Sequence, residues 1–329
     1  MALLAPAKHA LVTDAIRRSG WSALYVSGAT RMPFRIAAVR GTESVALWIY
    51  MWGLTPGGRK ALRDEYRIQV QTSRFSDSPG ARTLVLGWWK DGGVFAGFDV
   101  EKHRGPLGDN VSIQVSLTTL RNAVERGFDV SSGKGNGEVV AAFKPEYFMA
   151  YVESAQAIHG GREDLGLLKA AANPDVAAPK PPDAVPSPRK EVIRLVSTKV
   201  RASGFRDKVL RVYDHRCAFC DIQLDLVDAA HILPVASTGS TDDTPNGVAL
   251  CALHHRAYDA GLVTMLPDYA IRVNEEKAAQ LELANRAGRI EDFRADLKTI
   301  MSVPPNVADR PAKANVIRGN NLRGWPVAS

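Results

Sequence analysis

The sequence predicts an α+β protein made of two domains and a proline-rich segment between them. Short runs rich in β-branched and aromatic residues, which favour strands, dominate the chain before residue 165. Residues 171–190 then contain six prolines and no periodic apolar pattern. Beyond them, apolar residues recur at helical spacing, and a chain of 329 residues has room for two hydrophobic cores.

The N-terminal domain, residues 1–165, is predicted to be a mixed, mostly antiparallel β-sheet with flanking helices. Helical spacing favours helices at 6–18 and 117–127. Glycine-rich turns, such as the one at 91–93, separate the predicted strands. These strands are 45–52, 65–71, 83–89, 93–99, 111–115 and 139–143.

The proline-rich segment, residues 166–190, is predicted to be an extended and semi-rigid linker. A C-terminal domain follows over 191–302 and begins with helical spacing over 191–213. Gly204 is expected to break that helix, because glycine is unfavourable inside helices. Further helices are predicted before residue 302, and residues 303–329 are expected to be a flexible basic tail.

All three cysteines and three of the seven histidines lie between residues 217 and 255. Cys217 and Cys220 are separated by two residues, and so are Cys251 and His254. Two such pairs supply the four tetrahedral ligands that Zn²⁺ selects. The competing disulfide interpretation leaves one cysteine over, and the N-terminus has neither the length nor the charge of a secretory signal.

A zinc ion held by four protein ligands is structural, because a catalytic zinc keeps one position open for water. Any chemistry must therefore use other residues of this segment, and three polar side chains stand out. His231 follows an apolar strand-like run, Asn246 precedes another such run, and His255 follows the last expected zinc ligand. The alternative for His231 taken alone is a structural role, as a hydrogen-bonded histidine in the hydrophobic core.

In this segment the chain resembles the HNH family of metal-dependent nucleases, with a zinc-stabilised ββα-metal fold. The resemblance covers about residues 200–270. It implies that His231 is the general base, that Asn246 holds the hairpin loop and orients this histidine, and that His255 binds a catalytic Mg²⁺ or Mn²⁺. The matching blocks are 213–220, 230–234, 246–255 and 258–262.

One position departs from the family pattern. Many HNH enzymes have an acidic residue or a histidine before the general base as second metal ligand, and here Ala230 occupies that position. If a helix begins near His254, Asp259 lies four residues beyond His255 on the same face and is a candidate second ligand. Asp228 is the other candidate, and Asp259 as a structural cap or ion-pair partner is the alternative.

The formal net charge is +7, a balance expected of a protein that binds double-stranded DNA. Residues 1–40 hold six basic residues and one acidic residue. The tail adds basic residues that could contact phosphate, although solvated surface charge is the simple alternative. The sequence favours a cytoplasmic protein without membrane partners. The basic residues of the tail are Arg310, Lys313, Arg318 and Arg323.

A second resemblance concerns the N-terminal domain. A predicted strand ends at 99 and is followed by His103 and Arg104 in a loop with glycine and proline. Here the chain resembles the sulfur-binding domains of restriction enzymes directed against phosphorothioate DNA. The resemblance implies that His103 and Arg104, with an apolar patch around Pro145, Tyr147 and Phe148, contact the modified DNA.

Three functions follow from the sequence. The first is a type IV-like, modification-dependent restriction endonuclease that recognises phosphorothioate DNA and cuts nearby. The second is an HNH restriction endonuclease that reads 5-methylcytosine or an unmodified sequence. The third, favoured only by Ala230, is a zinc-stabilised DNA-binding protein that does not cut. Because one HNH site cuts one strand, double-strand cleavage would require a homodimer or a second binding event.

Overall fold

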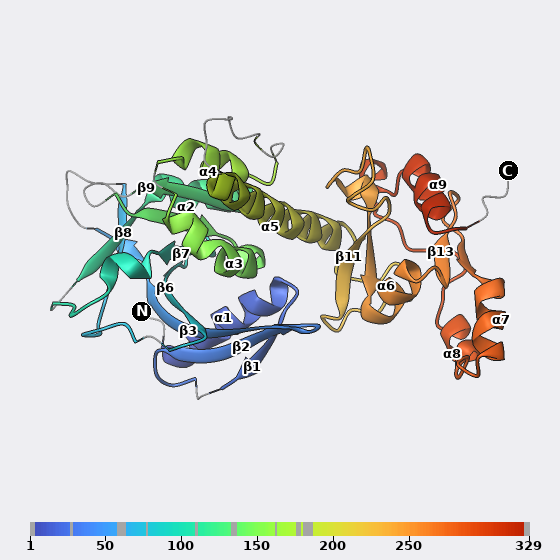
Figure 1. The fold of residues 1–329 in the computed structure, drawn as a ribbon, viewed down its shortest axis with the longest axis horizontal. Coiled ribbons are helices and arrows are strands. Elements are labelled where there is room, and N and C mark those ends of the chain that lie inside the picture. The colour runs from blue at the N-terminus through green and yellow to red at the C-terminus, as the bar shows by residue number, and fades with distance from the viewer. Residues whose placement is uncertain are drawn as a thin grey trace. The chain divides into compact units, whose positions relative to one another are not determined.

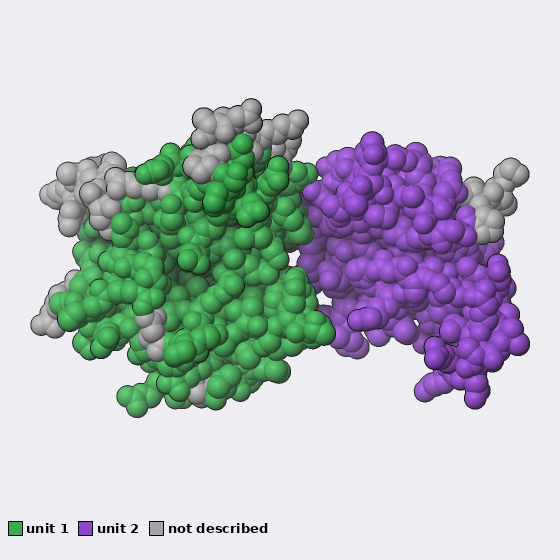
Figure 2. All heavy atoms as spheres, in the orientation of Figure 1, with its two compact units in different colours: residues 1–204 green, residues 205–329 purple. Residues whose placement is uncertain are grey.

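The computed structural model describes residues 4–26, 29–57, 64–76, 78–108, 111–132, 137–161, 163–175, 179 and 187–325. The chain divides into two compact units, residues 1–204 and 205–329 (Figure 2). Within the described residues, no helix combines the length and the apolar character needed to cross a membrane.

Unit 1 is built on a seven-stranded sheet with the order β1-β2-β3-β6-β7-β10-β9 (Figure 1). Neighbouring strands are antiparallel, except that β3 and β6 are parallel. The prediction of a mixed, mostly antiparallel sheet is therefore confirmed. The strands are β1 Ser22–Tyr25, β2 Phe34–Arg40, β3 Glu43–Gly53, β6 Ala81–Trp89, β7 Val94–Phe98, β9 Phe128–Ser132 and β10 Val139–Phe143.

Both faces of this sheet are buried. On β3, Leu47, Ile49 and Met51 belong to one hydrophobic core, whereas Tyr50 and Trp52 belong to another. Because side chains alternate along a strand, these two cores lie on opposite faces of the sheet. Strands covered on both faces have apolar runs without alternation. This explains why β7 and β10 are buried at every position.

Different elements cover the two faces. The first core includes residues of α1 (Ala5–Arg18), α3 (Phe148–His159), α4 (Leu165–Ala171) and the start of α5 (Ser187–Val212). The second core includes residues of the small sheet β4-β5-β8 and of α2. These elements are β4 Thr55–Pro56, β5 Glu65–Gln69, β8 Ser112–Ser116 and α2 Leu117–Arg126.

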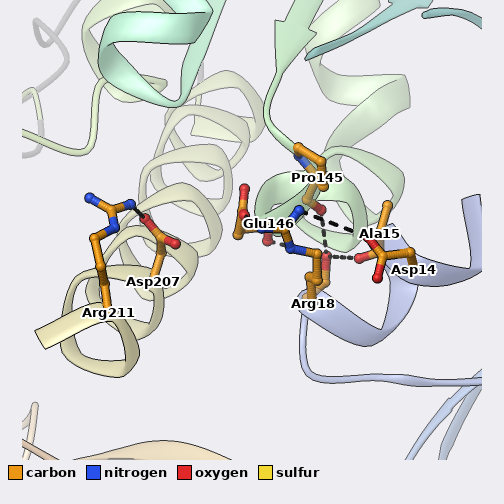
Figure 3. A network of polar contacts seen from close by, with 8 residues as sticks. Asp14, Ala15, Arg18, Pro145, Glu146, Asp207 and Arg211 are labelled. Carbon is orange, nitrogen blue, oxygen red and sulfur yellow. Dashed lines mark hydrogen bonds and ion pairs between the residues drawn. The ribbon is translucent and has the colours of Figure 1, made fainter. Parts of the chain in front are cut away.

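Hydrogen bonds and an ion pair connect the end of α1 to the 3-10 turn η2 (Pro145–Tyr147) and the start of α3. Arg18 forms an ion pair with Glu146 at 2.7 Å and lies 3.8 Å from Asp14 (Figure 3). Ser19 Oγ lies 3.2 Å from the Glu146 carbonyl oxygen and accepts a hydrogen bond from the Met149 amide. These contacts bring the segment from Pro145 onward against the core.

The two units divide within α5, at Gly204, and not at residue 191 as predicted. Ile193, Val196 and Val200 pack into the first core of unit 1, so the beginning of α5 belongs to that unit. The expected break at Gly204 is wrong, because α5 continues through it. A Cβ at Gly204 would lie 2.8 Å from the Pro174 Cβ, so close packing explains this glycine.

The predicted extended linker, residues 166–190, is partly helical in the structure. Its first part forms α4, and residues 187–190 begin α5. Residues 176–178 and 180–186 lie outside the described residues.

Unit 2 contains two small sheets and short helices around one core. The first sheet pairs β11 with β12, and the second pairs β13 with β14. Its elements are β11 Val227–His231, η3 Thr244–Asn246, β12 Gly247–Cys251, α6 Ala252–Asp259, β13 Val263–Met265, β14 Ile271–Val273, α7 Glu275–Leu283, α8 Ile290–Ala295, η4 Val307–Asp309 and α9 Lys313–Leu322.

The expected flexible tail is wrong for residues 307–309 and 313–322, which form η4 and α9. Val316 of α9 is fully buried in the core of unit 2. Asn320 accepts a hydrogen bond from Thr264 at 2.6 Å and donates one to the Met265 carbonyl at 2.8 Å. Burial and buried hydrogen bonds therefore hold this segment on the domain.

Close packing also fixes Gly97 in the middle of β7. The Tyr151 ring lies over this glycine, so that a Cβ at Gly97 would lie 2.3 Å from the Tyr151 hydroxyl. That hydroxyl is fixed by a 2.9 Å hydrogen bond to His159 Nε2, while His159 Nδ1 lies 2.7 Å from the Val139 carbonyl. Burial lowers the pKa of His159, which keeps the imidazole neutral and able to accept from Tyr151.

We expect Gly97→Ala to lower the free energy of unfolding by about 1–3 kcal/mol, because the added methyl group overpacks a site that cannot relax. Urea denaturation followed by tryptophan fluorescence measures this, since five of the six tryptophans lie in unit 1. The control is Gly53→Ala, where a Cβ would meet nothing within 4 Å. Equal stability of the two variants would contradict the packing argument.

Candidate functional site

The residues that the sequence singled out in unit 2 lie on a β-hairpin and the helix after it. β11 pairs antiparallel with β12, and the register places His231 opposite Gly247 and Val227 opposite Cys251. β12 is buried at every position. A Cβ at Gly247 would lie 2.2 Å from Val209 Cγ2, so glycine lets the hairpin approach α5 closely. The helix α6 starts directly after Cys251.

Three cysteines and one histidine converge where α6 begins. The ligand atoms of Cys217, Cys220, Cys251 and His254 all lie within 4.8 Å of one another. Cys217 and Cys251 place their sulfurs 3.5 Å and 3.3 Å from His254 Nδ1, and the Cys220 and Cys251 sulfurs are 4.0 Å apart. Tetrahedral zinc, with bonds of about 2.3 Å to sulfur and about 2.0 Å to nitrogen, separates its ligands by roughly 3.5–3.8 Å. The Cys₃His cluster therefore fits zinc.

The chemistry of this cluster supports a metal over a disulfide. The sulfurs of Cys220 and Cys251 are much farther apart than a disulfide bond of about 2.0 Å. The hydrogen bond with Cys217 holds the pKa of Cys251 well below its ordinary value, which favours a thiolate there. All four positions come from the protein, so the site is closed in the manner of structural zinc. Among the described residues, this is the one group of three or more potential ligands that converges in this way.

His231 ends β11 and is held on two sides of its ring. Its Nε2 lies 3.1 Å from Asp242 Oδ1, and its side chain is 19% exposed. The ring stacks on Phe205 of α5 with 3.7 Å between ring centroids and 15° between the planes. The imidazole is thus fixed in orientation yet accessible to solvent.

Asn246 is fully buried and holds the loop that follows His231. Its side-chain oxygen accepts from the Leu233 amide at 2.8 Å. Its side-chain nitrogen lies 3.1 Å from Ser240 Oγ and 2.9 Å from the Thr241 carbonyl oxygen. Through these bonds, one amide side chain joins both ends of the loop from 233 to 241.

The C-terminal helix reaches the same strand end. Arg323, directly after α9, donates hydrogen bonds to the carbonyls of His231 at 3.1 Å and Ile232 at 2.7 Å. Its guanidinium also lies 4.2 Å from the centre of the Tyr258 ring. Arg318 donates to the Thr238 carbonyl at 2.6 Å. Both arginines bind backbone carbonyls of the domain. Their contacts therefore support a structural role and not the predicted contact with phosphate.

His255 and Asp259 lie one turn apart on α6, as their spacing predicted. His255 Nε2 lies 3.5 Å from Asp259 Oδ2, and both side chains are accessible. Asp228, the other candidate ligand, instead forms an ion pair with Arg206 at 2.8 Å. Ala230 is buried in the core of unit 2. His255 and Asp259 therefore present two potential ligand groups on one accessible face of α6.

The predicted DNA contacts in unit 1 are mostly not at the surface. Tyr147 is 4% exposed and Phe148 is fully buried, both in the first core, and Pro145 is also buried. His103 Nε2 lies 3.0 Å from the buried carboxylate of Glu138. The apolar patch expected beside His103 and Arg104 is thus wrong, because these side chains fill the core.

Arg104 is the exception, since its side chain is half-exposed and forms an ion pair with Glu101. It borders a cavity of about 380 Å³ between the start of β6, the end of β7 and α3. Asp99, Tyr151 and Arg82 also line this cavity. Arg104 therefore stands at the edge of a concave surface of unit 1 that carries charges of both signs.

A comparison with protein families supports the interpretation of unit 2. The family described as HNH endonuclease matches residues 217–265, which span the cysteines, the hairpin and α6. The C-terminal unit contains an HNH endonuclease domain. In unit 1, the family described as Methylase-associated X1 matches residues 45–152.

Comparisons with solved structures and with curated proteins do not identify the fold or function of the whole chain. A solved structure described as a modification-dependent TagI restriction endonuclease is 12% identical to this chain, with a TM-score of 0.32. The match covers 86% of this chain and 82% of that chain. A TM-score this low does not establish a common fold. No curated protein matches the sequence significantly.

Around the HNH motif, the structure adds two residues that the sequence did not single out, Asp242 and Phe205, and gives Arg323 a role other than the predicted phosphate contact. Asp242 and Phe205 contact the His231 ring, and Arg323 binds its carbonyl. Asp242 lies beside Asp243 in a polar loop, and the sequence gives no signal for choosing between them. Phe205 lies on α5 before the matched HNH region of residues 217–265, and Arg323 lies well after it.

We expect His254→Ala to lose zinc and His255→Ala to retain it. His254 is 1% exposed and directs Nδ1 at the cysteines, whereas His255 faces outward. Because structural zinc contributes folding free energy, only His254→Ala should also lower the melting temperature of the HNH domain clearly. Elemental analysis and thermal unfolding of the two purified variants provide the measurement. Stoichiometric zinc in His254→Ala would disprove this ligand set.

Proposed function

We propose that the protein is a restriction endonuclease that cuts modified DNA. The observation that carries this proposal is the HNH endonuclease domain, in which an accessible and oriented His231 follows the β11 strand. The Methylase-associated X1 match in unit 1 is consistent with a link to DNA modification. A net charge of +7 favours binding to a polyanion.

In the proposed reaction, His231 is the general base. Phosphodiester hydrolysis requires that an attacking water lose a proton as its oxygen bonds to phosphorus, while the bond to the leaving sugar oxygen breaks. A rigid, partly exposed imidazole suits this role, and Asn246 supports it by holding the adjacent loop. The leaving oxygen gains a proton, so the overall reaction consumes one water.

His255 and Asp259 are the proposed ligands of a divalent cation, Mg²⁺ or Mn²⁺. When bound, such a cation neutralises charge on the scissile phosphate and on the leaving oxygen. Two protein ligands are sufficient for Mg²⁺, which usually keeps several waters and binds substrate phosphate. Zinc in the Cys₃His cluster has a separate role, because its closed ligand set holds the fold around α6.

For the recognised mark, we propose phosphorothioate as the first candidate, with Arg104 as the contacting residue. Arg104 is half-exposed beside a cavity, and a cation next to a partly apolar surface can favour the softer, less hydrated phosphorothioate. His103 supports the loop from inside through Glu138. The methylase association of the matched family favours 5-methylcytosine as the second candidate.

The nuclease proposal predicts that His231→Ala nicks DNA about 10²–10⁴ times more slowly than the wild type, the usual effect of losing a general base. Nicking of supercoiled plasmid with Mg²⁺ or Mn²⁺ measures this effect, with zinc content and DNA binding unchanged. The control is His215→Asn, an exposed histidine whose φ of 54° asparagine tolerates. An undiminished nicking rate of His231→Ala would show that His231 is not the general base.

The identity of the mark is tested with plain, 5-methylcytosine and phosphorothioate plasmids at one salt concentration. We expect the phosphorothioate plasmid to be cut fastest. Arg104→Ala should reduce cutting of that plasmid selectively, whereas Arg126→Ala, at the exposed end of α2, should leave the preference unchanged. An arginine that contacts any phosphate would weaken binding to all three equally. Preferred cutting of the 5-methylcytosine plasmid would support the second candidate.

A further inference from the structure

The contact between His231 and Asp242 has a chemical consequence that rests on the proposed nuclease function. A carboxylate can only accept a hydrogen bond, so at 3.1 Å the Nε2 atom of His231 must carry the proton. In the neutral imidazole the other nitrogen, Nδ1, then has a free lone pair. Nδ1 accepts no hydrogen bond from the described part of the chain.

We infer that Asp242 is a positioning residue that holds His231 as the Nε2–H tautomer and thereby makes Nδ1 the atom that takes the proton from the attacking water. After the transfer, the imidazolium keeps its Nε2–H on the Asp242 carboxylate. The charge that forms on the ring is then next to an anion, which stabilises it. A carboxylate that orients a histidine base in this manner is well established in other hydrolases.

The surroundings fix both partners of this hydrogen bond. Phe205 stacks on the ring of His231 and limits its tilt, and Arg323 binds its carbonyl. Asp242 directly follows Thr241, whose carbonyl oxygen accepts from the Asn246 side chain at 2.9 Å. Asn246 therefore acts on His231 through the loop that carries Asp242. These contacts explain how Asn246 can orient His231, the role that the HNH resemblance implies for it.

The test compares Asp242→Asn with Asp243→Asn in the full-length, zinc-loaded protein. The two substitutions remove the same charge from adjacent residues, but only Asp242 contacts His231. Two-dimensional ¹H–¹⁵N spectra of the histidine rings report the tautomer, and His231→Ala assigns the His231 signals. We expect a protonated Nε2 in the wild type and in Asp243→Asn, and a mixture of tautomers in Asp242→Asn.

Activity provides the second measurement, on the supercoiled plasmid that the wild type nicks. We expect Asp242→Asn to lower kcat about 10- to 100-fold, less than loss of the base itself, and to change KM by less than about twofold. Asp242→Glu should recover part of the rate. In the His231→Ala background, Asp242→Asn should have no further effect, because the two residues act through one group.

The outcomes separate this inference from the proposed function. A wild type that nicks while Asp242→Asn keeps both its tautomer and its rate would overturn the inference and leave the nuclease proposal intact. An additional rate loss from Asp242→Asn in the His231→Ala background would also overturn it, since Asp242 would then act elsewhere, for example on the cation. A wild type that cuts no plasmid would overturn the proposed function, while the spectra would still decide whether Asp242 sets the tautomer.

Discussion

The HNH domain depends on the convergence of four metal ligands from two distant parts of the chain. Cys217 and Cys220 come from the turn after α5, whereas Cys251 and His254 come from the junction of β12 and α6. A metal that joins these pairs closes the intervening chain into a loop. The same loop contains β11, His231 and Asn246, so the groups proposed for catalysis lie between two anchored ends. Zinc at this cluster would therefore restrain the chain that carries His231 and Asn246 from both of its ends.

The sequence predicts the central strands of unit 1 well and the periphery less well. The strands of 83–89, 93–99 and 139–143 are predicted because burial on both faces gives them dense apolar runs. The helix α3 was missed for the same physical reason. Five consecutive residues from Phe148 to Val152 are buried, so the first half of this helix shows no alternation of polar and apolar faces. The prediction of a helix break at Gly204 is wrong because the close contact of this glycine with Pro174 has no signal in the sequence.

For the site, local spacing was informative and long-range contacts were not. The two ligand pairs and the interval between His255 and Asp259 were predicted from spacing, because turns and helices fix such distances. By contrast, the surroundings of His231 come from Phe205, Asp242 and Arg323, which only the tertiary fold brings together. The prediction of a surface patch at Pro145, Tyr147 and Phe148 is wrong for a related reason. Apolar residues near a predicted binding loop are compatible with both a surface cavity and a core, and here the contacts of α1 place them in the core.

The position of α9 has a consequence for where this nuclease domain ends. Every residue of the matched HNH region lies before residue 266, yet the carbonyls of His231 and Ile232 are bound by Arg323. A Cβ on Gly319 would lie 2.4 Å from the Ile232 carbonyl oxygen, so the helix rests directly on the strand end. A fragment cut at the border of the motif would keep all proposed catalytic groups and lose the support beneath one of them. The structural unit that supports the hairpin is therefore larger than the matched HNH region.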